Sequence, residues 1–91
     1  MITVFAEISL SEHCCVDMQR FEEWAQAKPE IVECHLISGG FDYLLKCLVK
    51  NLAHYDALMI DLRAHGQPLA KFVSDVVARS PIVRGGASLS Q

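Results

Sequence analysis

The sequence predicts an α+β fold with the element order βαββαβ, in which two helices cover one face of a four-stranded antiparallel sheet. Three observations support this prediction. Apolar and polar residues alternate in the segments expected as strands, apolar residues recur at three- and four-residue steps in the segments expected as helices, and a pair of glycines separates the two middle strands. The length of 91 residues fits one such domain.

The first strand is expected at residues 2–10, which have an apolar face and a mixed face. The first face carries Ile2, Val4, Ala6, Ile8 and Leu10, and the second carries Thr3, Phe5, Glu7 and Ser9. Ser11 is a candidate N-cap, and the first helix is expected at about residues 14–28, because Pro29 stops it. One face of this helix carries Cys14, Met18, Phe21, Trp24 and Ala25.

Two strand-like segments, residues 31–38 and 42–49, flank the pair Gly39-Gly40, which is typical of a β-hairpin. Because glycine can adopt positive φ, we expect the chain to reverse at this pair and to expose backbone N–H groups beside Asp42. These donors and this carboxylate could hold a small zwitterion. The same residues also fit a purely structural turn, since hairpins need glycine for geometry and aspartate is common in turns.

The second helix is expected to begin after Asn51, a good N-cap, and to end at Gly66 and Pro68. Several apolar side chains repeat along one side of this segment. They are Leu52, Tyr55, Leu58, Met59 and Leu62. The spacing predicts that this side packs on the sheet.

The fourth strand is expected at residues 69–78, which contain several β-branched and aromatic side chains. After Pro81 the sequence has no apolar period and contains Gly85-Gly86-Ala87-Ser88. We therefore divide the chain into a domain at residues 1–80 and a flexible C-terminal tail at residues 81–91.

The predicted order is that of the ferredoxin-like fold, in which one sheet face has no helix. That face would carry Phe5 and one alternation class of residues 43–49, and both classes of that segment contain apolar side chains. We expect a second copy to cover it, which gives a homodimer or a higher homo-oligomer of the dimeric α/β barrel type. Lys46, Glu7 and His35 are the polar side chains that favour a monomer instead.

The charge and the hydropathy pattern argue against two classes of partner. The net charge is −3, and the eight lysines and arginines form no cluster, so this chain alone should not bind DNA. No apolar segment approaches the roughly 20 residues that span a bilayer, and the first residues do not form a signal peptide. We expect a cytoplasmic protein without a membrane partner.

The cysteines fit that compartment, because none belongs to a CxxC motif. They are Cys14, Cys15, Cys34 and Cys47, and we expect them to be buried free thiols. Cys34 and Cys47 fall on paired strands without standing opposite each other. His13 and His35 lie next to cysteines, but no second ligand pair is spaced to complete a tetrahedron. We therefore predict no metal site and no cofactor.

The sequence contains no recognisable catalytic constellation. None of its serines lies in a nucleophile elbow, and Glu22 and Glu23 are expected on the solvent side of the first helix. We expect that the chain is not an enzyme. The alternatives are a small dimeric ferredoxin-like enzyme of the monooxygenase or isomerase type and an ACT-type regulatory module. An enzyme would need a cavity between sheet and helices within one subunit, whereas a sensor would place its pocket between subunits.

The segment Ile37-Ser38-Gly39-Gly40-Phe41-Asp42-Tyr43-Leu44-Leu45-Lys46, with Pro29-Glu30-Ile31-Val32-Glu33-Cys34 upstream, resembles the effector-binding domain of the Lrp/AsnC (leucine-responsive/asparagine regulator) family of prokaryotic transcription regulators. The match is close around residues 21–46 and weakens toward the C-terminus. The resemblance implies an amino-acid-sensing and oligomerisation domain. It also implies that DNA is bound only through a helix-turn-helix domain, which is absent here because this sequence opens directly at the first strand.

The resemblance also implies a ligand-binding site at the contact between dimers. Gly39, Gly40 and Phe41 would supply backbone and shape, and Asp42 would face the ammonium group of the effector or fix the loop. Family members usually carry threonines that lead into the last strand, and the hydroxyl of Ser74 takes their place here, so Ser74 is the fifth residue of the implied site. A small amino acid bound there would shift the population of assembly states and so change the spacing of DNA-binding domains.

Overall fold

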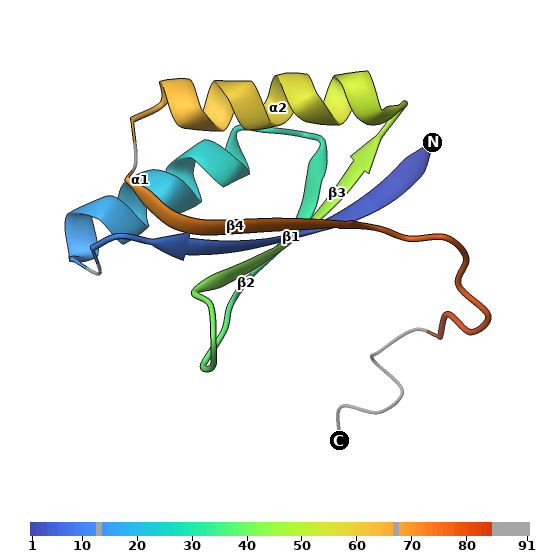
Figure 1. Ribbon diagram of the computed structural model, residues 1–91, viewed down its shortest axis with the longest axis horizontal. Helices are drawn as coiled ribbons and strands as arrows, with labels where there is room; N and C mark the ends of the chain where they lie inside the picture. The colour runs from blue at the N-terminus through green and yellow to red at the C-terminus, as the bar shows by residue number, and fades with distance from the viewer. Residues whose placement is uncertain (13, 67, 85–91) are drawn as a thin grey trace.

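The structure, a computed structural model, describes residues 1–12, 14–66 and 68–84 and has the predicted order of elements. Its strands are β1 (Ile2–Leu10), β2 (Ile31–Leu36), β3 (Tyr43–Val49) and β4 (Leu69–Val76). Its helices are α1 (Cys15–Gln26) and α2 (Leu52–Ala64). The predicted βαββαβ fold is confirmed (Figure 1). Neither helix in these ranges is long and apolar enough to cross a membrane.

The four strands form one antiparallel sheet in the order β2-β3-β1-β4, so that β2 and β4 are its edges. Register fixes which side chains share a face. Ile8 lies opposite Tyr43 on β3 and opposite Phe72 on β4. Cys34 lies opposite Leu45 on β3, so it does not face Cys47, as predicted.

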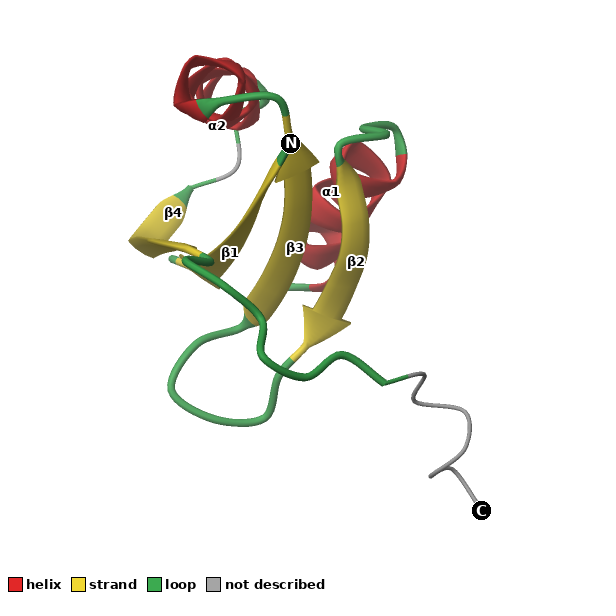
Figure 2. Cartoon of the chain, turned by 90° about the vertical axis from the view of Figure 1, so that its right-hand side faces the viewer, coloured by secondary structure: helices red, strands yellow, loops and turns green. Residues whose placement is uncertain are grey.

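Both helices lie on the same face of the sheet, with α1 behind β2 and β3 in Figure 2. The core between the two layers contains most of the predicted apolar faces of β1, α1 and α2. The prediction is wrong for Cys14 and Leu52, which are exposed because they lie where their helices begin. Its most deeply buried large side chains are Tyr43, Phe21, Ile8, Leu45, Leu62, Val4 and Val49, with Cys47 among them. The apolar and mixed sets of alternating side chains in the sequence therefore lie on different faces of the sheet, one covered by the helices and one open.

The two helices begin differently. The side chain of Asn51 accepts a hydrogen bond from the backbone of His54 at 2.9 Å, so the predicted N-cap of α2 is confirmed. The prediction of Ser11 as the N-cap of α1 is wrong, because the helix begins later and its N-cap is Cys14. The backbone N–H of Ser11 instead donates to the carbonyl of Pro68 at 2.9 Å, which ties the end of β1 to the start of β4.

The open face of the sheet consists of the side chains that alternate with the core. Phe5 and Leu44 on this face are half-buried, and Leu48 is 37% exposed. Val73 of β4 lies opposite Glu7 of β1. The expectation that both alternation classes of β3 contain apolar side chains is confirmed, because Leu44 and Leu48 point away from the helices.

The chain after β4 leaves the sheet in Figure 1. Residues 81–84 have no regular secondary structure, and residues 85–91 lie outside the described residues. The division at residue 80 and the flexible tail therefore stay predictions. The fourth strand ends at Val76, two residues earlier than expected.

Candidate functional site

The predicted site lies on the loop of residues 37–42, which connects the edge strand β2 to the inner strand β3. Figure 2 shows the connection as a wide loop that projects from the end of the sheet. Ser38, Gly39 and Gly40 are exposed, and Phe41 and Asp42 are half-buried. Four of the five predicted site residues therefore share one protruding loop.

The base of this loop is anchored to β1 through Asp42. The backbone N–H of Asp42 donates to the carbonyl of Ile8 at 3.1 Å, and the N–H of Leu10 donates to Oδ2 of Asp42 at 2.7 Å. The N–H of Ile37 donates to the carbonyl of Asp42 at 2.7 Å and closes the loop. One of the two roles expected for Asp42, fixing the loop, thus has a direct structural basis.

The expected tight reversal at Gly39-Gly40 is wrong in its geometry. The strands end at Leu36 and resume at Tyr43, so six residues form the connection. Neither glycine of the pair has positive φ. A Cβ at Gly40 would meet nothing within 4 Å, and one at Gly39 would make ordinary van der Waals contact with Ile37 at 3.7 Å. The subunit itself does not need glycine at either position.

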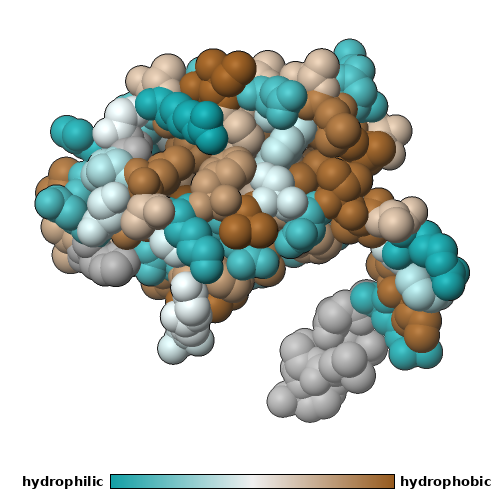
Figure 3. All heavy atoms as spheres, in the orientation of Figure 1, coloured by the Kyte–Doolittle hydropathy of each residue, from teal (hydrophilic) through white to brown (hydrophobic). Residues whose placement is uncertain are grey.

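The fifth predicted site residue, Ser74, lies away from the loop on β4. It pairs with Ala6 of β1, and its Oγ lies 2.5 Å from the hydroxyl of Tyr55 on α2. Ser74 lines a different cavity, of about 480 Å³, between α2 and β4, whose lining contains none of residues 37–42. Figure 3 shows apolar side chains over the region where the start of α2 lies above the end of β4, in agreement with the exposure of Leu52 and Val76. Within one subunit, the structure does not bring Ser74 to the loop.

Three polar side chains of the open face, Glu33, His35 and Lys46, form a small network at its β2 side. Glu33 accepts from His35 with an Nε2 to Oε1 distance of 3.0 Å and lies 3.6 Å from Nζ of Lys46. The hydrogen bond from His35, with the positive charge of Lys46, holds the pKa of Glu33 below its ordinary value. Two of the polar residues that argued for a monomer thus pair with Glu33, whereas the third, Glu7, lies between Leu44 and Val73 on the same face.

The expectation that all four cysteines are buried is wrong for three of them. All four are free thiols, but only Cys47 is buried, and burial raises its pKa to about 11. Cys14 and Cys15 lie at the exposed start of α1, and Cys34 lies on the edge strand β2. Among the described residues, no group of three or more histidine, cysteine, aspartate or glutamate side chains could hold a metal ion.

Two contacts near the loop were missed by the reasoning from sequence. Leu10 supplies the N–H that holds Asp42, and it is 32 residues away in the chain. Glu22 accepts a hydrogen bond from the hydroxyl of Tyr43 at 2.5 Å and is half-buried, although we expected it on the solvent side of α1. Nothing in the local sequence indicates either pair, because both depend on how the helix and strands meet.

Comparison with known proteins assigns the chain to a class of regulatory domains. Residues 3–86 match the family described as the Lrp/AsnC ligand binding domain. The chain belongs to this family. Its members are regulator domains rather than enzymes, and they typically bind amino-acid effectors and mediate oligomerisation. The family resemblance predicted from residues 29–46 is confirmed.

One similar relative is the leucine-responsive regulatory protein of Escherichia coli K12. It is 41% identical over 58 residues, which cover 64% of this chain and 35% of that protein. The relative from Klebsiella pneumoniae has the same identity and coverage. The match thus spans about a third of the length of these curated relatives.

Solved structures agree with the fold. An AsnC family transcriptional regulator from Agrobacterium tumefaciens is 30% identical, with a TM-score of 0.81 over 90% of this chain and 53% of that one. A transcriptional regulator from Neisseria meningitidis in complex with L-Met is 18% identical, with a TM-score of 0.81 over 97% of this chain and 58% of that one. At that identity, the second likeness shows the fold alone.

Proposed function

We propose that this chain is the amino-acid-sensing and oligomerisation domain of a cytoplasmic Lrp/AsnC-type transcription regulator, without catalytic activity of its own. The effector is a small α-amino acid, bound between subunits at Gly39, Gly40, Phe41 and Asp42. Binding favours one assembly state over another and so changes how DNA-binding domains are spaced. Family membership supports the general function, and the loop supports the site.

The observation that carries this proposal is the geometry of the glycine pair. Both glycines are exposed on a protruding loop, yet neither has a conformation or a close contact that excludes a side chain. Glycine is also used where a ligand or another chain approaches the backbone closely. We assign this role to Gly39 and Gly40. Three cavities among the described residues have linings that contain none of residues 39–42, which supports a site completed by a second subunit.

The loop offers the groups that an α-amino acid needs. A bound zwitterion requires N–H donors for its carboxylate and an acceptor for its ammonium group, and both must be paired once water is removed. Residues 39–41 supply backbone N–H groups, and Asp42 supplies the carboxylate. Because Asp42 is anchored to Leu10, its position relative to the loop backbone is set before the effector arrives.

The open face of the sheet is proposed as the dimer interface. Phe5, Leu44, Leu48 and Val73 lie on this face, and a second copy would remove them from water. DNA contact is assigned to a helix-turn-helix domain in a different part of the regulator. The chain has a net charge of −3 and no cluster of its eight lysines and arginines, so it lacks the basic patch that would displace counterions from duplex DNA.

Calorimetric titration of the 91-residue chain with a panel of amino acids tests the proposal. At least one small amino acid is expected to bind, and Asp42→Asn is expected to weaken its binding by about 1.5–3 kcal/mol, the range for a charge-assisted hydrogen bond. The amide oxygen of asparagine can still accept from the N–H of Leu10, so the loop keeps its anchor while the charge is lost.

Asp56→Asn serves as the matched control, because Asp56 is exposed on α2 and lines the cavity that contains Ser74. It removes one negative charge outside the loop and should leave the affinity unchanged. Equal affinities of wild type and Asp42→Asn would show that Asp42 shapes the loop and does not bind the ammonium group. Absence of binding across the whole panel would reject sensing and leave an assembly module.

A further inference from the structure

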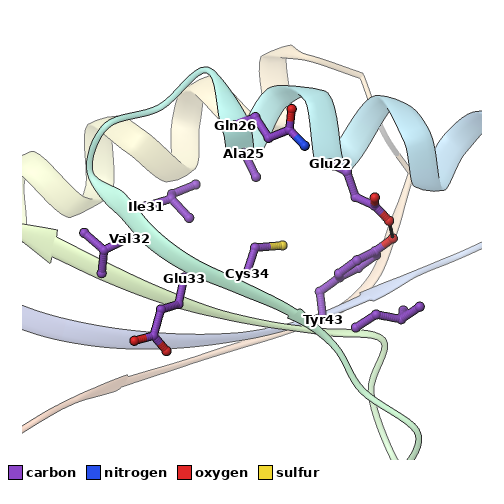
Figure 4. A pocket seen from close by; sticks show the side chains of 9 residues that line it. Glu22, Ala25, Gln26, Ile31, Val32, Glu33, Cys34 and Tyr43 are labelled. Carbon is purple, nitrogen blue, oxygen red and sulfur yellow. Dashed lines mark hydrogen bonds between the residues drawn. The ribbon is translucent and has the colours of Figure 1, made fainter. Parts of the chain in front are cut away.

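A cavity of about 470 Å³ lies between α1 and the edge strand β2, on the helix side of the sheet. This volume is within the range of about 300–1,000 Å³ that is usual for small-molecule sites. Residues 37–42 do not line it, so it is separate from the proposed effector site. Figure 4 shows its lining side chains, which come from α1, β2 and the start of β3.

One end of the cavity is polar and rigid. The hydroxyl of Tyr43 donates to Oε2 of Glu22 at 2.5 Å, and Figure 4 shows these two side chains reaching toward each other. The ring of Tyr43 is 1% exposed and packs on Phe21, with 4.5 Å between ring centroids. Burial and the neighbouring Glu22 raise the pKa of Tyr43, so its hydroxyl remains a donor. The carboxylate of Glu22 is therefore held in one place.

Apart from Glu33, the remaining wall of the cavity is apolar or uncharged. Its apolar members are Ala25, Ile31, Val32 and Leu36. Cys34 points toward the polar end in Figure 4. Although the residue is exposed overall, partial desolvation of its thiol raises the pKa, so Cys34 adds no charge. Glu33 points away from Glu22 in the same view, toward the open face where it pairs with His35 and Lys46.

The charged side chains that line this cavity are all acidic. No lysine, arginine or histidine is among the lining residues, and Glu22 forms no ion pair with any residue in the described ranges. A fixed carboxylate at the end of an apolar cavity favours a cation, and a compact ammonium group matches a single carboxylate. A ligand carboxylate would instead lie near Glu22 and Glu33 without a cationic side chain to pair with.

From this geometry we infer that the cavity between α1 and β2 binds a small primary amine with an apolar alkyl or aryl body, and that it discriminates against the corresponding α-amino acid. The ammonium group lies against Glu22, and the hydrocarbon part lies on Ile31 and Val32. The ligand class is thus the amine that remains when an apolar amino acid loses its carboxylate. Its site is complete within one subunit.

Titration of the ¹⁵N-labelled 91-residue chain, followed by NMR, tests this inference. Isopentylamine and phenethylamine are the probes, and leucine and phenylalanine are the corresponding amino acids. We expect the amines to shift the amide signals of Glu22, Cys34 and Tyr43 in a saturable way. The amino acids should leave these three signals in place, even if they shift the signals of the loop at residues 39–42.

A neutral probe tests the charge without altering the protein. Isopentanol has the shape of isopentylamine, and it should bind at least about tenfold more weakly if the ammonium group meets Glu22. Glu22→Gln should weaken amine binding by a similar factor. Glu23→Gln is the matched control on the same helix, because Glu23 is exposed and does not line the cavity, and it should have no effect.

Any of four results would overturn the inference, the fourth being that no amine binds at all. The first is equal binding of isopentanol and isopentylamine by the wild type, which does not depend on whether a variant folds. The second is binding of leucine at the cavity signals as tightly as the amine. The third is saturable binding of the amine with no shift at Glu22, Cys34 or Tyr43. These results are independent of the test of the effector loop, whose signals are separate.

Discussion

The two faces of the sheet are built from alternate residues of the same strands, yet they have different environments. On β3, Leu45 is fully buried under the helices, whereas its neighbour Leu44 points to the open face and is only half-buried. On β1, Ala6 and Phe5 differ in the same way. The apolar side chains of the covered face are buried by the helices of the same chain. The open face has large apolar side chains that the chain does not cover.

This difference shows which features serve the subunit and which serve its partners. Residues of the covered face pack within one chain, so their contribution to stability is intramolecular. Residues of the open face gain their full burial only from another molecule, so their contribution depends on protein concentration. Gly66 and Gly40 differ in a similar way. The subunit needs glycine at position 66, where φ is positive, but it does not need glycine at position 40.

The largest expected effect is on the covered face. Leu45→Ala should lower the free energy of unfolding by about 2–5 kcal/mol, because it leaves a cavity in a closely packed core. Denaturation by urea at several protein concentrations measures this loss, which should be independent of concentration. Leu44→Ala is the control, and its loss should grow with protein concentration. Equal, concentration-independent losses for both variants would show that the two faces do not differ.

The second effect is on assembly. Light scattering at micromolar concentration should give the wild type at least twice the 10.1 kDa mass of the monomer. Phe5→Lys places a charge in the centre of the open face and should reduce the mass to that of the monomer. Ile60→Lys makes the same chemical change on the exposed side of α2 and should leave the mass unchanged. A monomeric wild type would remove the argument for an interface.

A smaller effect is expected from the glycine that the subunit needs. Gly66 has a φ of 95° after the end of α2, a conformation that side chains rarely adopt. Gly66→Ala should destabilise the chain by about 1 kcal/mol in thermal or urea denaturation. Gly40→Ala should change stability by no more than about 0.5 kcal/mol, since a Cβ there meets nothing within 4 Å. A larger loss from Gly40→Ala than from Gly66→Ala would reverse this ranking.

The smallest effects concern two pairs of glutamate and histidine, both with N–O distances of 3.0 Å. The side chains of Glu30 and His54 are 26% and 29% exposed. The side chains of the second pair, Glu33 and His35, are more exposed, at 47% and 52%. Exposed pairs contribute little, because water and salt screen them. Glu30→Gln should therefore destabilise the chain more than Glu33→Gln at neutral pH, when both are compared in the monomeric Phe5→Lys background.

The pH dependence sharpens this last comparison. The hydrogen bond from His54 holds the pKa of Glu30 below its ordinary 4.5, so the unfolded chain takes up protons more readily than the folded chain. The contribution of Glu30 is complete above pH 4.5 and is lost as the pH falls through the lower pKa of the folded state. Urea midpoints from neutral pH to about pH 3 should therefore converge for wild type and Glu30→Gln. Parallel curves would contradict the assignment.

The repeating patterns predicted most of the fold. Residues 2–10 alternate strictly, and their apolar set is the set that the helices cover. Asn51 marked the start of α2, because a side chain at an N-cap acts on a backbone group only three residues away. In contrast, Ser11 does not cap α1, because the chain at Ser11 is still hydrogen-bonded to Pro68, a partner distant in sequence, and the helix begins only after Cys14. A hydrogen bond can be predicted from the sequence when its donor and acceptor are close in the chain.

The candidate site was predicted only in part, for the same reason. Residues 39–42 lie together because they are consecutive, and their role as an effector site stays a proposal. Ser74 was selected as the nearest hydroxyl in sequence, but strand pairing places it opposite Ala6 and beneath Tyr55. The pair of Glu22 and Tyr43 joins a helix to a strand and leaves no periodic signal in either segment.

The sequence by itself determined the alternation of side chains along each element, and with it the fold class, the excess apolar surface and the family. These depend on the periods of the strand and the helix, which are properties of the local backbone. The tertiary structure decided which distant groups meet. It brought the N–H of Leu10 to the carboxylate of Asp42 and the hydroxyl of Tyr43 to Glu22, because strand register and helix packing place these groups in contact across long stretches of chain.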